Sequence, residues 1–95
     1  MKILAIEKEM EGVEWDQLGD LLKEEAQLVY ALYLSDSLRE IYFTENRNAI
    51  LVMEAEDKKA ALQLLDTLPL VKSGKITFEV MELRPYTGYE RFMNL

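Results

Sequence analysis

The chain has 95 residues, 49% of them apolar, and a formal net charge of −7. This length and composition indicate one folded domain spanning residues 1–95, with a single small core. The sequence contains neither cysteine nor histidine. Their absence excludes disulfides, thiolate nucleophiles and zinc–thiolate sites, and it removes the usual general base near neutral pH. Acid–base chemistry would therefore depend on carboxylates, tyrosine, lysine or a bound ligand.

The charge and the apolar pattern also restrict the partners. The 11 lysines and arginines are scattered along an acidic chain, so we expect no binding of nucleic acid. No apolar run approaches the roughly 20 residues that cross a bilayer, so no membrane partner is expected. The apolar run at the start meets Glu7 too soon for a signal peptide. We therefore expect a cytoplasmic protein.

The first half of the sequence predicts a strand, a loop and a helix. Residues 2–7 form a short apolar run, which is typical of a buried strand, and an acidic loop follows. Asp16 is placed to cap a helix through its carboxylate. Apolar residues then recur with helical spacing until the helix ends near Ser35. They are Leu18, Leu21, Leu22, Ala26, Val29, Leu32 and Tyr33.

The second half predicts a hairpin, a helix and a last strand. Residues 38–44 and 48–55 have strand composition and are joined by a polar turn. A helix follows from about Asp57 and ends near Pro69, because proline cannot continue it. A turn at Gly74 leads into the last strand.

This order of elements, strand–helix–strand–strand–helix–strand, predicts a fold class. It is that of an α+β, ferredoxin-like βαββαβ domain. Its antiparallel sheet has the order 4-1-3-2, with both helices on one face.

Alternation along the strands assigns side chains to the two faces of the sheet. One parity, which we place under the helices, contains Leu4, Ile6, Ile41, Phe43, Phe78 and Val80. The other parity contains Ile3, Ala5, Glu7, Glu40, Tyr42, Thr77, Glu79 and Met81. The run 48–55 is apolar at both parities, which indicates that both faces are covered. A homodimer, or a larger assembly of dimers, would cover the second face; the alternative is an open, half-polar face.

Leu68-Pro69-Leu70, followed by Gly74 and a strand that closes on Leu83, resembles the muconolactone-isomerase-like proteins. These belong to the dimeric α+β barrel superfamily, in which two ferredoxin-like sheets join into one barrel. The resemblance is best over residues 49–83, and in the first half it extends to element order alone. It implies the fold, a dimer and a small-molecule site. The histidine typical of these isomerases just after the last strand is missing here, so no catalytic residue transfers by motif.

Three residues on the face assigned to the barrel interior are candidates for catalysis. A carboxylate of Glu40 or Glu79 in a partly apolar cavity would have a raised pKa and act as the base. The hydroxyl of Tyr42 would donate a hydrogen bond to a developing enolate oxygen. In the alternative interpretation, the glutamates form structural ion pairs with Arg39, Arg84 or a lysine across the dimer.

Two further segments have alternative interpretations. Glu7, Glu9, Glu11 and Glu14 offer oxygen ligands for a hard cation, but they lack the spacing of a calcium loop, and a solvated acidic loop is the alternative. Trp15 is either a hydrophobic staple beside the first helix or the lid of a ligand pocket.

The C-terminal arm, residues 84–95, carries three aromatic residues: Tyr86, Tyr89 and Phe92. We expect this arm to pack on the partner subunit. Its aromatic side chains could instead close one end of a small-molecule cavity.

Together these observations predict a muconolactone-isomerase-like small-molecule protein. The resemblance implies a cofactor-free isomerase or lyase that acts on a small carbonyl acid or lactone, and neither a cofactor nor a metal is expected. One alternative is a non-catalytic dimeric binding or assembly module. Another is a cofactor-independent monooxygenase, which would need a pocket large enough for a polycyclic substrate.

Overall fold

The computed structural model describes residues 1–93. Its elements follow in the predicted order, with short additional turns. They are β1 (Lys2–Glu9), the 3₁₀ turn η1 (Trp15–Gln17), α1 (Gly19–Leu34), β2 (Leu38–Phe43), β3 (Ala49–Glu54), α2 (Lys58–Leu65), α3 (Pro69–Lys72), β4 (Ile76–Glu82) and the 3₁₀ turn η2 (Gly88–Arg91).

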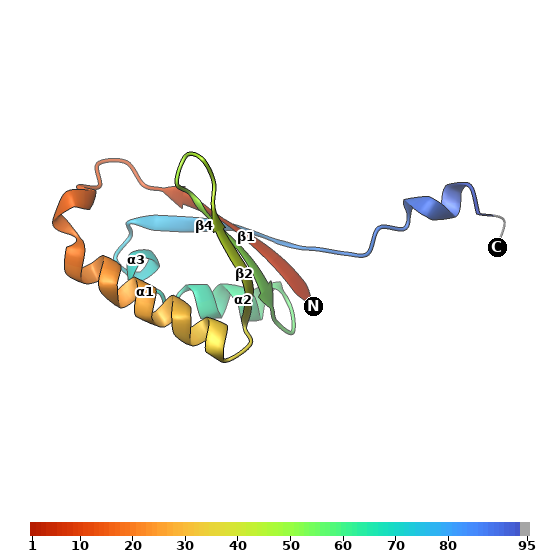
Figure 1. Cartoon of the computed structure of the whole chain (residues 1–95), viewed down its shortest axis with the longest axis horizontal. Helices are drawn as coiled ribbons and strands as arrows, with labels where there is room; N and C mark the ends of the chain where they lie inside the picture. Colours follow the sequence, from red (N-terminus) through yellow and green to blue (C-terminus); the bar gives the residue numbers. More distant parts are fainter. Residues whose placement is uncertain (94–95) are drawn as a thin grey trace.

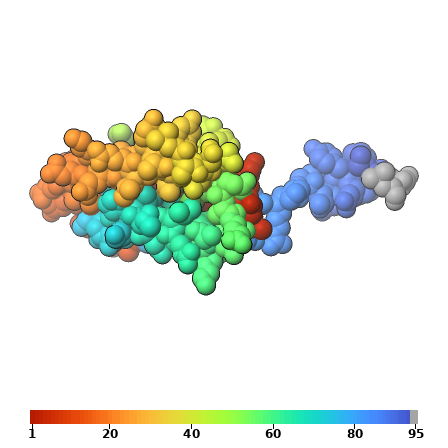
Figure 2. Space-filling model, turned by 90° about the horizontal axis from the view of Figure 1, so that it is seen from below, coloured from red at the N-terminus to blue at the C-terminus, as the bar shows by residue number. Residues whose placement is uncertain are grey.

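The four strands form one sheet in the order β2-β3-β1-β4, and every neighbouring pair is antiparallel. Read from the other edge, this is the predicted order 4-1-3-2. All three helices lie on one face of the sheet, and the opposite face is uncovered (Figure 1). α1 lies beside α2 and α3 in this layer (Figure 2), and it packs against α3 and β2. The predicted ferredoxin-like α+β fold is confirmed.

The core lies between the sheet and the helices. Ile3 and Ala5 of β1 are fully buried there and pair with Met53 and Leu51 of β3. α2 contributes Ala61 and Leu65 to the same cluster, and Leu68, which immediately precedes α3, joins them. Burying a leucine fully stabilises the fold by about 2 kcal/mol relative to leaving it exposed.

The face assignment predicted for β1 was wrong. Ile3, Ala5 and Glu7 point to the helices, whereas Leu4 and Ile6 lie half-buried on the open face. The sequence is apolar at four consecutive positions here, so alternation alone does not fix the parity. Pairing with β3 fixes it, since the buried Leu51 and Met53 must lie opposite residues of the same face. The assignments in β2 and β4 are confirmed, because Ile41 and Val80 pair with Leu51 and Ala5.

The helix termini follow the sequence in part. Asp57 accepts a hydrogen bond from the Ala60 amide at 2.8 Å and so caps α2. The prediction that Asp16 caps α1 was wrong. Asp16 lies within η1, and α1 begins after Leu18 without a side-chain cap. Pro69 follows the end of α2, as expected, but it also begins α3, where its missing N–H and fixed φ suit the first turn.

Two apolar surfaces remain exposed. On the open face, Leu4, Ile6, Ile50 and Val52 are half-buried, and Tyr42 is 60% exposed. The chain after β4 extends away from the body as an arm (Figure 1). On this arm Tyr86 and Phe92 are 69% and 75% exposed, and both rings contact the ring of Tyr89 edge to face.

The cap of α2 can be tested directly. We expect Asp57→Ala to lower the free energy of unfolding by about 1 kcal/mol, since the Ala60 amide loses its acceptor. Asp57→Asn is the matched control, because its amide oxygen can accept the same bond. Urea denaturation of the three proteins measures the difference, and equal stability of the alanine and asparagine variants would contradict the assignment.

Candidate functional site

A cleft of about 920 Å³ lies between α1 and the helix-covered face of the sheet. It exists because the facing surfaces of α1 and β2 are incompletely covered: no residue of α1 is fully buried, and on β2 Ile41 and Phe43 are 44% and 73% exposed. The walls are mainly apolar and come from α1, β2, β3, α3 and the start of β4. Such a concave, largely apolar space with a few polar groups is typical of a small-molecule site.

Glu7 is the buried polar group of this cleft. It is only 8% exposed, and its Oε1 accepts a hydrogen bond from the Ala49 amide at 2.6 Å. The ladder between β1 and β3 ends at Ile6 and Ile50, so the carboxylate satisfies the next amide of β3. Burial raises the pKa of Glu7, the Ala49 amide opposes this by stabilising the carboxylate, and the charge of Glu9 adds a smaller increase.

Glu25 is the second carboxylate, and it enters the cleft from α1. Its Oε1 accepts a hydrogen bond from the Leu70 amide at 2.9 Å. Because Pro69 has no amide hydrogen and Leu68 provides no side-chain cap, Leu70 offers the first free donor of α3, and Glu25 satisfies it. Burial raises the pKa of Glu25, the Leu70 amide lowers it less, and the charge of Glu7 raises it further.

The two carboxyl groups are thus coupled, since the charge of Glu7 disfavours ionisation of Glu25. Each keeps one oxygen fixed by a backbone amide. Carboxyl groups with raised pKa values in an apolar space are suited to take up and return protons. The arrangement brings two carboxyl groups with raised pKa values to the same cleft.

The remaining polar groups lie around this pair. Trp15 lines the cleft beside the start of α1, and Tyr30 and Tyr33 line it along the same helix. The rings of Tyr30 and Tyr33 stack with their centroids 6.3 Å apart. The alternative in which Trp15 borders a ligand pocket therefore agrees with its position. Arg47 reaches the cleft from the turn between β2 and β3.

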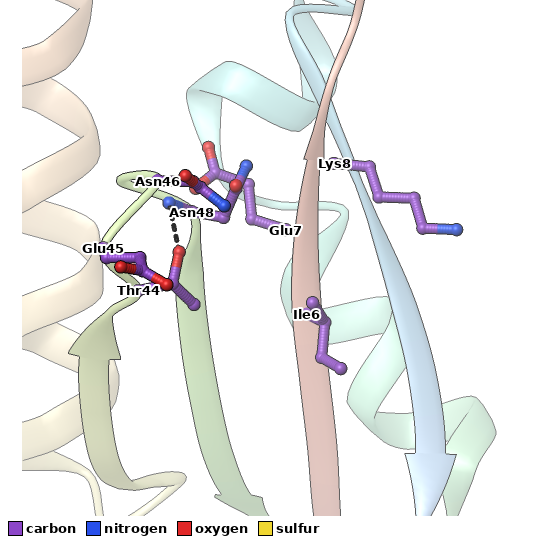
Figure 3. A pocket seen from close by; sticks show the side chains of 7 residues that line it. All are labelled: Ile6, Glu7, Lys8, Thr44, Glu45, Asn46 and Asn48. Atoms are coloured by element: carbon purple, nitrogen blue, oxygen red, sulfur yellow. Dashed lines mark hydrogen bonds between the residues drawn. The ribbon is translucent and has the colours of Figure 1, made fainter.

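A shallower depression of about 660 Å³ lies at the same end of the sheet (Figure 3). In that view the Glu7 side chain points towards Asn46 and Asn48 of the turn, while Lys8 points away from them on the other side of β1. The Thr44 hydroxyl accepts a hydrogen bond from the Asn48 amide at 3.2 Å. Most residues that line this depression are polar and it is open to solvent, and we assign no chemistry to it.

The residues predicted as catalytic lie outside the cleft, on the open face of the sheet. The Tyr42 hydroxyl donates a hydrogen bond to Glu40 Oε1 at 2.9 Å, so these two residues are brought together on β2. The carboxylate of Glu40 raises the pKa of the Tyr42 hydroxyl, which is exposed. Glu79 lies on β4, the opposite edge strand, and pairs with Lys8 at 3.3 Å. With two strands between them, the two edges are separated by roughly 14 Å.

The other predicted sites can also be located. Glu7 and Glu9 belong to β1 rather than to an acidic loop. Within residues 1–93, no three acidic side chains gather closely enough to hold a metal ion. None of the helices in this part of the chain combines the length and the apolarity needed to cross a bilayer.

The sequence did contain a signal for one of the two cleft carboxylates, Glu25. Glu25 is four residues after Leu21 and four before Val29, so it interrupts the apolar face of the predicted helix. A charged residue in that position is buried or enters a cavity. Glu7 was assigned to the open face together with the wrong parity of β1. Its burial depends on the register with β3, which no local pattern reveals.

Comparison with protein-family models gives no match, and a search of curated proteins gives none of significance. Solved structures do match. A crystal structure of muconolactone isomerase has a TM-score of 0.76 at 18% identity, over 92% of both chains. The 5-chloro-2-hydroxyhydroquinone dehydrochlorinase of Burkholderia phenoliruptrix, in complex with 2,5-dihydroxybenzoquinone, has a TM-score of 0.69 at 16% identity, over 93% of this chain and 98% of its own. The chain therefore has the muconolactone-isomerase-like fold predicted from its sequence.

The raised pKa of Glu7 predicts the sign of a pH effect. Its ordinary value is 4.5, and below this the protonated group fits the fold without penalty. As the pH rises through the raised native value, the protein loses stability, because the unfolded state ionises more readily. We expect the difference in melting temperature, Glu7→Gln minus wild type, to increase from pH 4 to pH 8. Glu11→Gln, at an exposed position, is the control, and a difference independent of pH would contradict the assignment.

Proposed function

We propose that the protein is a cytoplasmic, cofactor-free isomerase or lyase that moves a proton on a small carbonyl acid or lactone in the cleft. The observation that carries this proposal is the pair of carboxyl groups, Glu7 and Glu25, in a mainly apolar space. Both have raised pKa values, and both are held by backbone amides from different elements. No cofactor or metal is needed for proton transfer next to a carbonyl group.

In this mechanism the ionised carboxylate removes a proton from the carbon next to the substrate carbonyl. The C–H electron pair moves into the carbonyl system and forms an enolate. The enolate then collapses in one of two ways. A carboxylic acid returns a proton to another carbon, which moves the double bond, or a leaving group departs with its electron pair, which completes an elimination. Glu7 is the favoured base, since its charge disfavours ionisation of Glu25.

The names of the two similar structures support this reaction class. One protein is an isomerase of a lactone, and the other removes hydrogen chloride from a chlorinated hydroxyhydroquinone. An isomerisation of that kind and such an elimination are the two outcomes of the same enolate. The support comes from the shared fold, and the assignment of residues rests on this chain alone.

The sequence-predicted roles of Glu40 or Glu79 as base and of Tyr42 as electrophilic partner stay a prediction. On the open face these groups would act on a substrate only where another subunit covers them. The proton-exchange experiment below includes variants of Glu79 and Tyr42, so that the two sites can be compared.

We also propose a homodimer formed through the open face, with the arm packed on the partner. The half-buried Ile6 and Val52 on this face and the exposed aromatics of the arm support it, because contiguous apolar surface is favourably buried on association. The predicted arm spans residues 84–95, of which 94 and 95 lie outside the described residues. The same surfaces support the second candidate, a non-catalytic dimeric binding or assembly module.

Proton exchange tests the catalytic proposal without a known product. Muconolactone and small unsaturated lactones are incubated with the protein in D₂O, and deuterium incorporation next to the carbonyl is followed by NMR. We expect Glu7→Gln and Glu25→Gln to lower the exchange rate about 100-fold or more, as is usual when a general base is lost.

The matched variants are Tyr42→Phe and Glu79→Gln, which change the open face and leave the cleft intact. Unchanged exchange in these two supports the cleft as the site. The reverse pattern would support the site predicted from the sequence. Absence of exchange in the wild type with every substrate would favour the non-catalytic module.

The dimer has its own test. Ile6→Glu places a charge in the middle of the open face, so we expect the mass measured by light scattering to fall from that of a dimer towards that of a monomer. Lys59→Glu, on the exposed surface of α2, is the control and should keep the wild-type mass. A monomeric wild type would reject the proposed dimer.

A further inference from the structure

The turn between β2 and β3 holds an arginine in an unfavourable backbone conformation. The Thr44 carbonyl accepts from the Arg47 amide at 2.8 Å, and the Asn48 carbonyl accepts from the Thr44 amide at 2.9 Å. Closing the turn in this way requires a left-handed residue, and Arg47 has a φ of 65°. Glycine and asparagine adopt this conformation readily, whereas arginine is strained there.

The strain is notable because asparagine stands on either side, at positions 46 and 48. Strained backbone that persists in a fold is concentrated at functional sites. The turn also places Arg47 against the cleft. We therefore infer that arginine occupies this position because its side chain is required there, and not because it stabilises the turn.

Charge gives a second, independent observation. Among the described residues that line the cleft, Arg47 is the only cation, and three glutamates line the same space. Within residues 1–93, the ion pairs involve Lys8, Arg39, Arg84 and the N-terminal amine, but not Arg47. None of these ion pairs occupies its guanidinium, which is exposed and borders the cleft.

We propose that Arg47 binds the carboxylate of the ligand at the edge of the cleft, and so selects small organic acids over neutral molecules of the same shape. A guanidinium binds a carboxylate through two parallel N–H···O bonds, which fix its orientation as well as attracting it. The apolar part of the ligand then points inward, towards Glu7 and Glu25. This inference rests on the proposed function and makes its substrate class narrower: a monocarboxylate with an apolar body.

The cleft contains its own reporter for the test. Trp15 is the one tryptophan of the chain and lines the cleft, so its fluorescence responds when a ligand enters. Benzoate and benzamide are suitable probes, since they have nearly the same shape and differ in charge at neutral pH. We expect the wild type to bind benzoate about tenfold more tightly than benzamide, as one charge-assisted pair at a partly solvated site would give.

The informative variant is Arg47→Asn, because asparagine tolerates the left-handed conformation. We expect it to lose the preference for benzoate, to keep the wild-type affinity for benzamide, and to melt at the same or a higher temperature. Arg47→Lys keeps the charge without the planar fork and should retain part of the preference. Arg39→Asn removes the same charge from a position that does not line the cleft, and it should behave as the wild type.

Equal affinity of the wild type for both probes, or an unchanged preference in Arg47→Asn, would overturn the role of Arg47. In either case benzamide binding would still show that the cleft takes ligands, and the proposed function would stand. If neither probe changes the fluorescence of Trp15, the cleft takes no ligand of this kind, and the proposed function fails together with this inference.

Discussion

The hydrogen bond from the Ala49 amide to the Glu7 carboxylate connects the fold with the candidate site. It lies where the ladder between β1 and β3 ends, so a side chain rather than a backbone carbonyl satisfies the next amide of β3. This replacement holds an ionisable group on the helix-covered face, where it is 8% exposed. A buried carboxylate with one hydrogen bond is still poorly solvated, and its pKa is raised. The end of the β1–β3 ladder is thereby the place where a carboxyl group that can carry a proton is held.

The cleft depends on how α1 is supported. The helix contacts β2 and α3, and Glu25 connects its first half to α3 through the Leu70 amide. Between these supports the helix covers the sheet incompletely, and no residue of α1 is fully buried. A tighter α1 would bury Ile41 and Phe43 and would remove the cleft. The sequence permits the open arrangement because a glutamate, rather than a leucine, occupies the position between Leu21 and Val29 on the inward face.

The architecture could be predicted from the sequence because each element has strong local signals, such as Asp57 at the start of α2 and Pro69 after its end. The sheet order followed from the order of elements. The faces of β1 could not be predicted, since Ile3, Leu4, Ala5 and Ile6 are all apolar and only pairing with β3 decides which of them point inward. That one error moved Glu7 to the wrong side. The predicted residues Glu40 and Glu79 share a face as expected, but they lie on opposite edges of it, a separation that alternation along single strands does not report.

Three features that lower stability meet at one place. Glu7 and Glu25 hold carboxylates in partly desolvated positions, and Arg47 holds a left-handed backbone. Each could be relieved by a single substitution: glutamine keeps the hydrogen-bond acceptors, and asparagine suits the turn. A sequence shaped by stability alone would not be expected to place all three around the same cleft. Their chemistry is also complementary: a fixed cation at the edge would orient an organic acid, and two coupled carboxyl groups inside would exchange protons with its far end. The coincidence of strain, burial and complementary charge therefore supports the proposal that the ligand site is the cleft rather than the open face of the sheet.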